Sequence, residues 1–232
     1  MFDTGRNGHR SDDKTSAFLN LCAARVPRNA EFSRFSEALF RNAAAEDVAG
    51  YAPGEMLALA EAAFARAEAV RPGESHVELF DPVAERTDFP RRGTVLVAVN
   101  DDSPFLFDSV VNEITAEGLR LDAAFHPIVE MAGRRASIVV LVLESVADEK
   151  RRAALKDAVT AVLSAVHAAV EAWQPMRARL AEAIGWLRAN PPAVAREELD
   201  ESIAFLEWLG KGHFTFLGTR DYAYSSEGGG RM

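Results

Sequence analysis

Residues 94–144 read TVLVAVNDDSPFLFDSVVNEITAEGLRLDAAFHPIVEMAGRRASIVVLVLE. The run 94–99 is apolar and rich in β-branched residues, a pattern that predicts a strand and is too short for a helix. The period then becomes that of a helix, with one apolar stripe formed by Phe107, Val110, Val111 and Ile114. This stretch therefore begins with a strand that is followed by an amphipathic helix.

Residues with special backbone preferences mark both ends of this helix. Ser103 can cap a helix that begins at Pro104, where the missing N–H and the fixed φ cost nothing. Gly118 stands where the C-terminus of a helix favours a residue with positive φ. We therefore predict that the helix begins at Pro104 and ends before Gly118.

Two further strands follow the helix. From residue 119 the period is two, so one face of this strand is expected to carry Leu119, Leu121, Ala123, Phe125, Pro127, Val129 and Met131. Residues 132–134 predict a turn, and 137–143 form a second strand that is wholly apolar. A long amphipathic helix is predicted over 148–173.

The order strand, helix, strand, strand, helix supplies five of the six elements of a ferredoxin-like sheet, so we predict an α+β fold. Strands 95–99 and 138–143 do not alternate, whereas a strand with one face in water does. Each large aliphatic side chain left in water would forgo roughly 1.5–3 kcal/mol. Both faces are therefore expected to be covered, by the N-terminal helices, by another copy or by a further domain.

Helical spacing recurs on both sides of this sheet module. Helices are predicted over 16–26, 29–48 and 55–70, the second of them capped by Asn29, and a strand is predicted over 76–80. After the sheet module, Gln174-Pro175 is expected to interrupt the long helix.

The predicted organisation has six parts. They are a disordered tail at 1–13, a helical segment at 14–75, the α+β module at 76–173, a helical extension at 174–212, a strand at 213–224 that closes the sheet or starts a second module, and a flexible tail at 225–232.

The composition is that of a globular protein, because 48% of the residues are hydrophobic and 26% are charged. A net charge of −9 disfavours nucleic-acid binding, and Arg91-Arg92 is too short to form a basic strip. The lone Cys22 excludes an intramolecular disulfide and suits a reducing compartment. With neither a signal peptide nor about 18 consecutive apolar residues, we expect a cytoplasmic protein without a membrane partner.

The motifs that carry common chemistries are absent from the sequence. It contains no GxGxxG or P-loop motif for phosphates, no HExxH or CxxC metal spacing and no GxSxG nucleophile elbow. We therefore predict that this chain holds no catalytic residue, no cofactor and no metal.

Three features are candidates for ligand binding. Asp101-Asp102-Ser103 joins a strand end to a helix start, where ligands gather, although these residues can equally cap and turn the chain. His126, which precedes a proline, is either a pH-sensitive ligand contact or a residue at a strand edge or bulge. His213 is either functional or the structural start of a strand.

Four ordered segments resemble the N-terminal region of the large bacterial NAD-specific glutamate dehydrogenases. NDDSPFLFDS at 100–109 is similar to that family's NDDMPFLVDS signature. The segments at 118–129, 213–220 and 71–82 resemble its GL…HPV, HFTFLGYR and RPGE…VFNP segments. The resemblance extends from about residue 40 to residue 224. The chain departs from the family at three positions, Ser103 for methionine, Phe107 for valine and Thr219 for tyrosine.

The resemblance implies an ACT-like regulatory module. In that family the catalytic and NAD-binding domains lie far downstream, so NAD would not bind to this segment. ACT domains often carry DxPGLL in their first strand-to-helix loop, where this chain has Phe105 in place of the glycine. The residues expected to bind a regulatory ligand or form an interface are Asp101, Asp102, Ser103, Phe105, Leu106 and His126.

Two functions of different classes follow from these observations. The first is a non-catalytic, ACT-like N-terminal segment of a large NAD-dependent glutamate dehydrogenase, with roles in oligomer assembly and in allosteric regulation by amino acids. The alternative is a free-standing small-molecule sensor or adaptor of ACT type. The expected partners are the rest of the same polypeptide, the subunits of a homo-oligomer and an amino-acid effector.

Overall fold

The computed structural model describes residues 16–20, 22, 24, 29–41, 43, 47–48, 50–85, 93–214 and 216–222. The chain forms two compact units, residues 1–166 and residues 167–232. The tails predicted at 1–13 and 225–232, and the Arg91-Arg92 pair, lie outside the described residues.

The first unit is built on one antiparallel sheet. Its strands are β1 (His76–Phe80), β2 (Thr94–Asp101), β3 (Leu121–Phe125), β4 (Ile128–Met131) and β5 (Arg134–Leu143). The sheet order is β1-β2-β5-β3, and β4 pairs with the other end of β5. The two apolar strands β2 and β5 therefore form the centre of the sheet.

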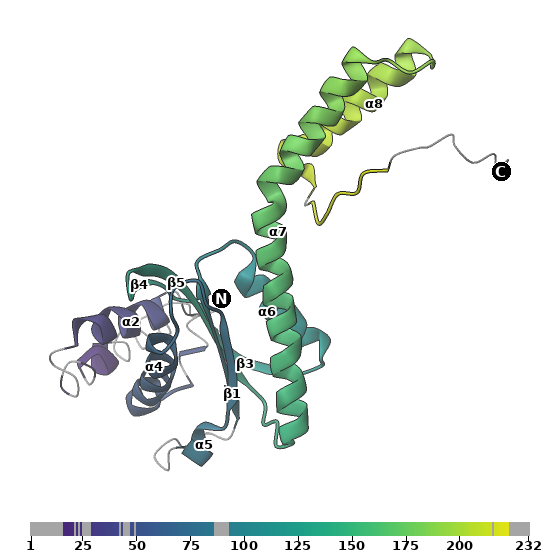
Figure 1. The fold of residues 1–232 in the computed structure, drawn as a ribbon. Helices are drawn as coiled ribbons and strands as arrows, with labels where there is room; N and C mark the ends of the chain where they lie inside the picture. The colour runs from purple at the N-terminus through teal and green to yellow at the C-terminus, as the bar shows by residue number, and fades with distance from the viewer. Residues whose placement is uncertain are drawn as a thin grey trace, which may run out of the picture. The chain divides into compact units, whose positions relative to one another are not determined.

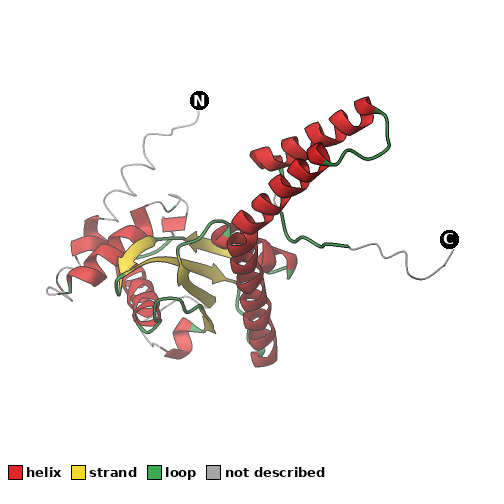
Figure 2. Cartoon of the chain, turned by 45° about the horizontal axis from the view of Figure 1, so that its top comes forward, coloured by secondary structure: helices red, strands yellow, loops and turns green. Residues whose placement is uncertain are grey.

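Helices cover the sheet on both faces, as Figures 1 and 2 show. One face is covered by α2 (Ala30–Arg41) and α4 (Pro53–Glu68). The other face is covered by α6 (Leu106–Ala116) and by the first turns of α7 (Glu149–Ala189). The short helix α5 (Pro82–Glu85) follows β1. This arrangement confirms the α+β fold predicted from the sequence.

The side chains of β2 alternate between two separate apolar cores. Val95, Val97 and Val99 pack with α2 and α4, whereas Leu96 and Ala98 pack with α6 and α7. All five residues are fully buried, and β5 alternates in the same way. The prediction of a covered sheet is confirmed, and the N-terminal helices supply the second cover.

Short-range patterns fix three boundaries as predicted. The Asn29 side chain caps α2, because its Oδ1 accepts hydrogen bonds from the backbone N–H groups of Glu31 and Phe32 at 3.1 and 3.0 Å. Gly118 ends α6 with a φ of 72°. A two-residue turn joins β4 to β5, and both of its residues, Ala132 and Gly133, have positive φ.

Two local predictions were wrong in detail. α2 ends at Arg41, and Ala43 is not helical, so this helix is shorter than the predicted 29–48. The segment 119–131 does not present one face throughout. Ala123 and Phe125 lie in the core with α2 and α4, but Leu119 lies in the core with α6 and α7. A register shift between residues 121 and 123 exchanges the faces, as a β-bulge does.

The C-terminal half of the chain differs from the prediction at two points. α7 continues through Pro175 instead of ending there, and the described residues after His213 form no strand. β1 occupies the edge of the sheet beside β2, so no closing strand is needed there. The alternative, that the His213 segment opens a second module, stays a prediction.

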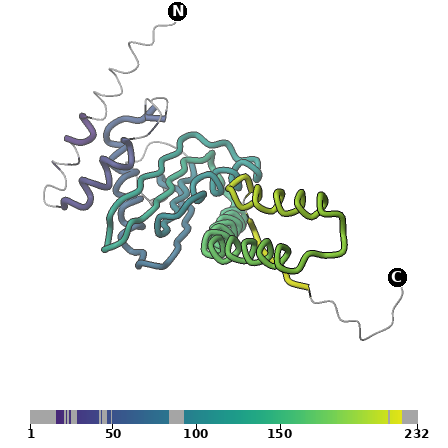
Figure 3. Tube along the Cα trace, turned by 90° about the horizontal axis from the view of Figure 1, so that it is seen from above, coloured from purple at the N-terminus to yellow at the C-terminus, as the bar shows by residue number. Residues whose placement is uncertain are grey.

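The second unit contains the end of α7, α8 (Arg196–Trp208) and the π-helical turn η1 (Leu209–His213). Figure 3 shows the end of α7 and α8 running side by side. The Arg188 side chain donates a hydrogen bond of 2.6 Å to Glu207 across this pair. Among the described residues of this unit, three apolar side chains are buried: Met176, Ile184 and Ile203.

Among the described residues, α7 is long and apolar enough to cross a membrane by length and composition. One such helix is weak support for a span, because core helices pass the same test. Leu155, Val159 and Leu163 of α7 are buried in the core with the sheet. The expectation of a protein without a membrane partner stays a prediction.

We predict that Leu141→Ala lowers the free energy of unfolding by about 2–5 kcal/mol, because Leu141 is fully buried in the central strand β5. The matched control is Leu217→Ala at a residue that is 83% exposed, where a change within about 0.5 kcal/mol is expected. Urea unfolding of both variants gives the comparison. Equal losses would contradict the two-sided core.

Candidate functional site

The loop that joins β2 to α6 has an unusual backbone at its last residue. Instead of starting a helix at Pro104, the chain makes a turn at Pro104 and Phe105, and α6 begins at Leu106. Phe105 has φ 70° and ψ −3°, the conformation of the third residue of a type II turn. The predicted cap by Ser103 is absent, because no side chain caps α6. Its first backbone N–H groups therefore lack a capping side chain.

A cavity of about 530 Å³ lies at this loop. Most of its wall comes from the loop and the first turn of α6, and the rest comes from the connection between β3 and β4 and from the first residue of β4. The lining residues are Asp102, Ser103, Pro104, Phe105, Leu106, Phe107, Asp108, His126 and Ile128. Five of the six residues predicted from the sequence are among them. The four lining residues that were not predicted as site residues are Pro104, Phe107, Asp108 and Ile128. The first three belong to the segment 100–109 that carries the family resemblance, whereas Ile128 comes from β4, which pairs with β5.

Asp101 is the predicted site residue that does not line the cavity. Its carboxylate accepts a hydrogen bond of 2.7 Å from Arg134 and one of 3.0 Å from the backbone N–H of Gly73. Arg134 also donates to the carbonyl oxygen of Val70 at 3.2 Å. Asp101 therefore ties β2 to the chain that follows α4, and its role is structural.

His126 forms one wall of the cavity and is held on two sides. Its ring stacks on Phe107 with 5.0 Å between the centroids and 7° between the planes. Its Nε2 lies 2.8 Å from Oγ of Ser137. Burial lowers the pKa of His126 below its usual value, and the nearby carboxylates of Asp102 and Asp108 oppose this shift. A histidine with a lowered pKa is neutral at neutral pH.

The described residues that line the cavity include two carboxylates and no lysine or arginine. Asp102 is paired with Arg135, with 2.8 Å between Nε and Oδ2. Asp108 lies in the first turn of α6, where a negative charge is favourable. Because Arg135 offsets the charge of Asp102 and the imidazole is neutral, Asp108 gives the cavity wall one negative charge, which favours a positively charged group.

Two buried polar side chains lie behind this wall. Asn100 and Ser137 are directly opposite each other in the pairing of β2 with β5, and both are fully buried. Neither Nδ2 nor Oδ1 of Asn100 has a hydrogen-bond partner within the described part of the chain. Ser137 contacts His126, but it is too deeply buried for the pair to act on a substrate as nucleophile and base.

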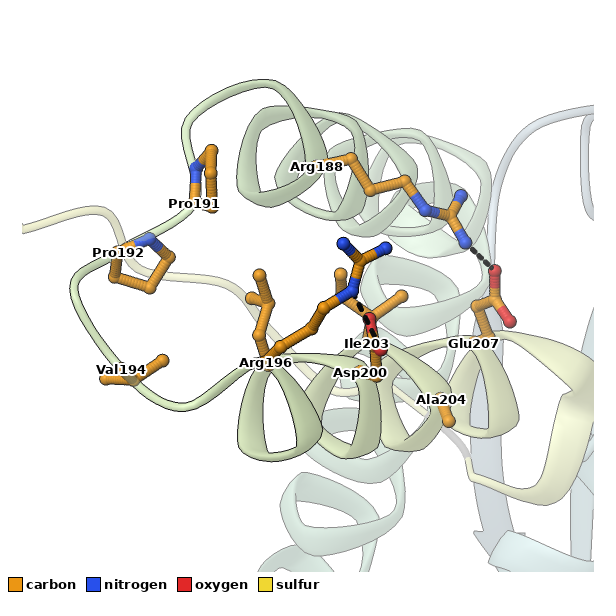
Figure 4. Close-up of a pocket in the computed structure, with 10 residues that line it drawn as sticks. Arg188, Pro191, Pro192, Val194, Arg196, Asp200, Ile203, Ala204 and Glu207 are labelled. Carbon is orange, nitrogen blue, oxygen red and sulfur yellow. Dashed lines mark hydrogen bonds and ion pairs between the residues drawn. The ribbon is translucent and has the colours of Figure 1, made fainter.

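The second unit contains another cavity, of about 580 Å³, between the end of α7 and α8 (Figure 4). Its two arginines are each paired with a carboxylate of the same cavity. Arg188 lies 2.6 Å from Glu207, and Arg196 lies 3.8 Å from Asp200. Most of these charged side chains are well exposed. This cavity therefore presents no unbalanced charge to a ligand, and the loop cavity is the stronger candidate site.

We predict that Phe105→Gly is more stable than Phe105→Ala by about 1 kcal/mol, because only glycine adopts a positive φ without strain. Both variants remove the same exposed ring, which is 59% accessible to water, so the comparison isolates the backbone. Thermal or urea unfolding measures the difference. If alanine were as stable as glycine at this position, the left-handed loop would be contradicted.

Comparison with known proteins shows that the segment containing this loop matches a protein family. The family described as "Glutamate dehydrogenase, ACT1 domain" matches residues 35–180, which include every residue that lines the loop cavity. The chain is similar to the NAD-specific glutamate dehydrogenase of Pseudomonas aeruginosa, with 28% identity over 181 residues, which are 68% of this chain and 11% of that protein.

It is also similar to the NAD-specific glutamate dehydrogenase of Halomonas elongata, with 29% identity over 184 residues, 66% of this chain and 11% of that protein. The chain thus spans about 11% of the length of these curated relatives. The family match extends over more than half of the chain. This protein therefore belongs to the ACT1 domain family of glutamate dehydrogenases.

Proposed function

We propose that this chain is a non-catalytic regulatory segment of a large NAD-dependent glutamate dehydrogenase and that it binds an amino acid at the β2–α6 loop. The observation that carries the proposal is the cavity at this loop, which lies wholly within the residues matched to the ACT1 family. The oxidation of L-glutamate by NAD to 2-oxoglutarate, ammonium and NADH would take place in domains outside this chain.

The charges around the loop suit the two ends of an amino acid. The first turn of α6 offers backbone N–H groups that no side chain caps, and such groups favour a carboxylate. Asp102 and Asp108 line the same cavity and can accept hydrogen bonds from an ammonium group. The exposed side chains of Phe105 and Ile128 supply apolar surface for the rest of the ligand.

Calorimetric titration of the 232-residue chain with the amino acids tests this role. We predict that at least one amino acid binds and that Asp108→Asn weakens its binding about fivefold, the effect of losing one exposed ion pair. The matched control is Asp157→Asn, an exposed residue of α7 outside the cavity, which is expected to leave the affinity unchanged. Absence of binding by every amino acid would contradict a sensing role and leave a structural one.

We also infer a role in assembly for the second unit, because seven of the nine exposed large apolar side chains among the described residues belong to it. Among the described residues they are Trp186, Val194, Phe205, Trp208, Phe214, Leu217 and Tyr222. Phe205 and Trp208 stack on each other with 6.1 Å between ring centroids, which makes a continuous aromatic surface. Because the curated relatives are about nine times as long as the matched segment, further parts of the same polypeptide are the proposed partner.

Hydroxyl-radical footprinting can test this assignment. We predict that Phe205 and Trp208 are readily oxidised in the 232-residue chain and are protected severalfold in the longer native polypeptide. Phe18, which is fully buried, is the control and should be unreactive in both. Equal reactivity of Phe205 and Trp208 in the two samples would contradict the assignment. If Phe205 and Trp208 were protected from oxidation in the 232-residue chain at micromolar concentration, the surface would instead be assigned to contact with a second copy of this chain.

A further inference from the structure

One face of α8 carries a stripe of exposed side chains. Glu198, Glu201, Phe205 and Trp208 follow one another at intervals of three, four and three residues, and all four are exposed. This is the a/d spacing of a coiled-coil seam, which places the side chains on one face over a length of roughly 15 Å. Ile203 is buried and lines the cavity between α8 and α7 (Figure 4). It is two residues from both Glu201 and Phe205, so the stripe faces away from α7.

The C-terminal half of this stripe is aromatic. Phe205 and Trp208 are 58% and 43% exposed. The Trp208 ring also stacks on the ring of His213, with 4.7 Å between the centroids, and lies 6.0 Å from the ring of Phe214. Four aromatic rings therefore form one surface at the end of α8. Exposed aromatic surface of this kind is typical of an interaction site.

The N-terminal half of the stripe is acidic. Within the described part of the chain, neither Glu198 nor Glu201 forms an ion pair, whereas Asp200 and Glu207, on the side toward α7, are each paired with an arginine. A polar residue at a seam position of a coiled coil fixes the register, because it needs a complementary group on the facing helix. The complement of a glutamate is lysine or arginine.

A second copy of α8 does not supply this partner. In a parallel pair each glutamate of the stripe would face a glutamate, and the like charges would repel. In an antiparallel pair Glu198 and Glu201 would lie against the rings of Trp208 and Phe205, which buries carboxylates without a positive charge. The net charge of −9 adds repulsion between copies at longer range. The curated relatives extend far beyond the matched segment, so most of such a polypeptide lies outside this chain.

We propose that the stripe from Glu198 to Trp208 binds an amphipathic helix from another part of the same longer polypeptide. That helix carries large apolar side chains opposite Phe205 and Trp208, and lysine or arginine opposite Glu198 and Glu201. The inference rests on the proposed assembly role of the second unit and adds the chemistry and geometry of the partner. It makes α8 one strand of a coiled coil between unlike helices, with aromatic packing at one end and charge pairing at the other.

Charge reversal in the longer native polypeptide tests the inference. Glu198→Lys with Glu201→Lys is expected to raise the oxidation rate of Trp208 by hydroxyl radicals severalfold, to that of the 232-residue chain, because two ion pairs become two like-charge contacts. The matched control is Asp157→Lys with Glu171→Lys, the same change in charge at two exposed positions of α7, which should leave Trp208 protected. All four positions are exposed and lysine is a good helix former, so circular dichroism should show unchanged helix content in both variants.

A second measurement needs no variant. Carbodiimide couples a carboxylate to a neighbouring lysine amine. In the unchanged longer polypeptide it is expected to join Glu198 or Glu201 to a lysine outside these 232 residues, on a segment whose apolar residues have helical spacing. Mass spectrometry of the coupled peptides identifies that segment.

The outcomes separate the inference from the assembly role on which it rests. If Phe205 and Trp208 are as reactive in the longer polypeptide as in the 232-residue chain, both are wrong. If the two residues are protected but the charge reversal does not alter their protection, the inference is wrong and the assembly role stands. Coupling of the two glutamates only to lysines within these 232 residues, or to a segment without helical spacing, would equally overturn the inference alone.

Discussion

The pairing of β2 with β5 carries fully buried apolar side chains on both faces of the sheet, and the rest of the first unit follows from covering them. The two strands pair in register from Thr94 opposite Leu143 to Asp101 opposite Ala136. Because neither face can be left in water, α2 and α4 must cover one side, and α6 with the first turns of α7 the other. The residue before β2, Gly93, is also close to β5. A Cβ at this position would lie only 2.8 Å from the carbonyl oxygen of Leu143, so a larger residue would clash there.

The candidate site arises where this apolar pairing ends. The last two residues of β2 are polar and point to opposite faces of the sheet. Asp101 pairs with Arg134 and ties the sheet to the chain after α4, whereas Asn100 faces Ser137 on the side of the cavity. The chain then crosses to α6 through a loop whose last residue, Phe105, is left-handed.

The elements that short-range patterns determine could be predicted from the sequence. They include the two central strands and the end of α6 at Gly118. Five residues of the cavity wall could also be predicted, because their segment resembles a known family. The start of α6 could not be predicted, because a phenylalanine is not an expected left-handed residue. The reversal of faces near residue 122 depends on a bulge, and the isolation of the Asn100 amide depends on strand register. Neither feature has a local signal.

Native-state hydrogen exchange tests the central claim most directly, because it measures the stability of each strand separately. The account predicts that the amides of Val97 and Leu141, in the middle of β2 and β5, are among the slowest to exchange. Their opening free energy should equal the free energy of global unfolding, while the amides of α8 should exchange much faster. Exchange of Val97 and Leu141 at the rate of α8 would contradict a fold that depends on this pair of strands.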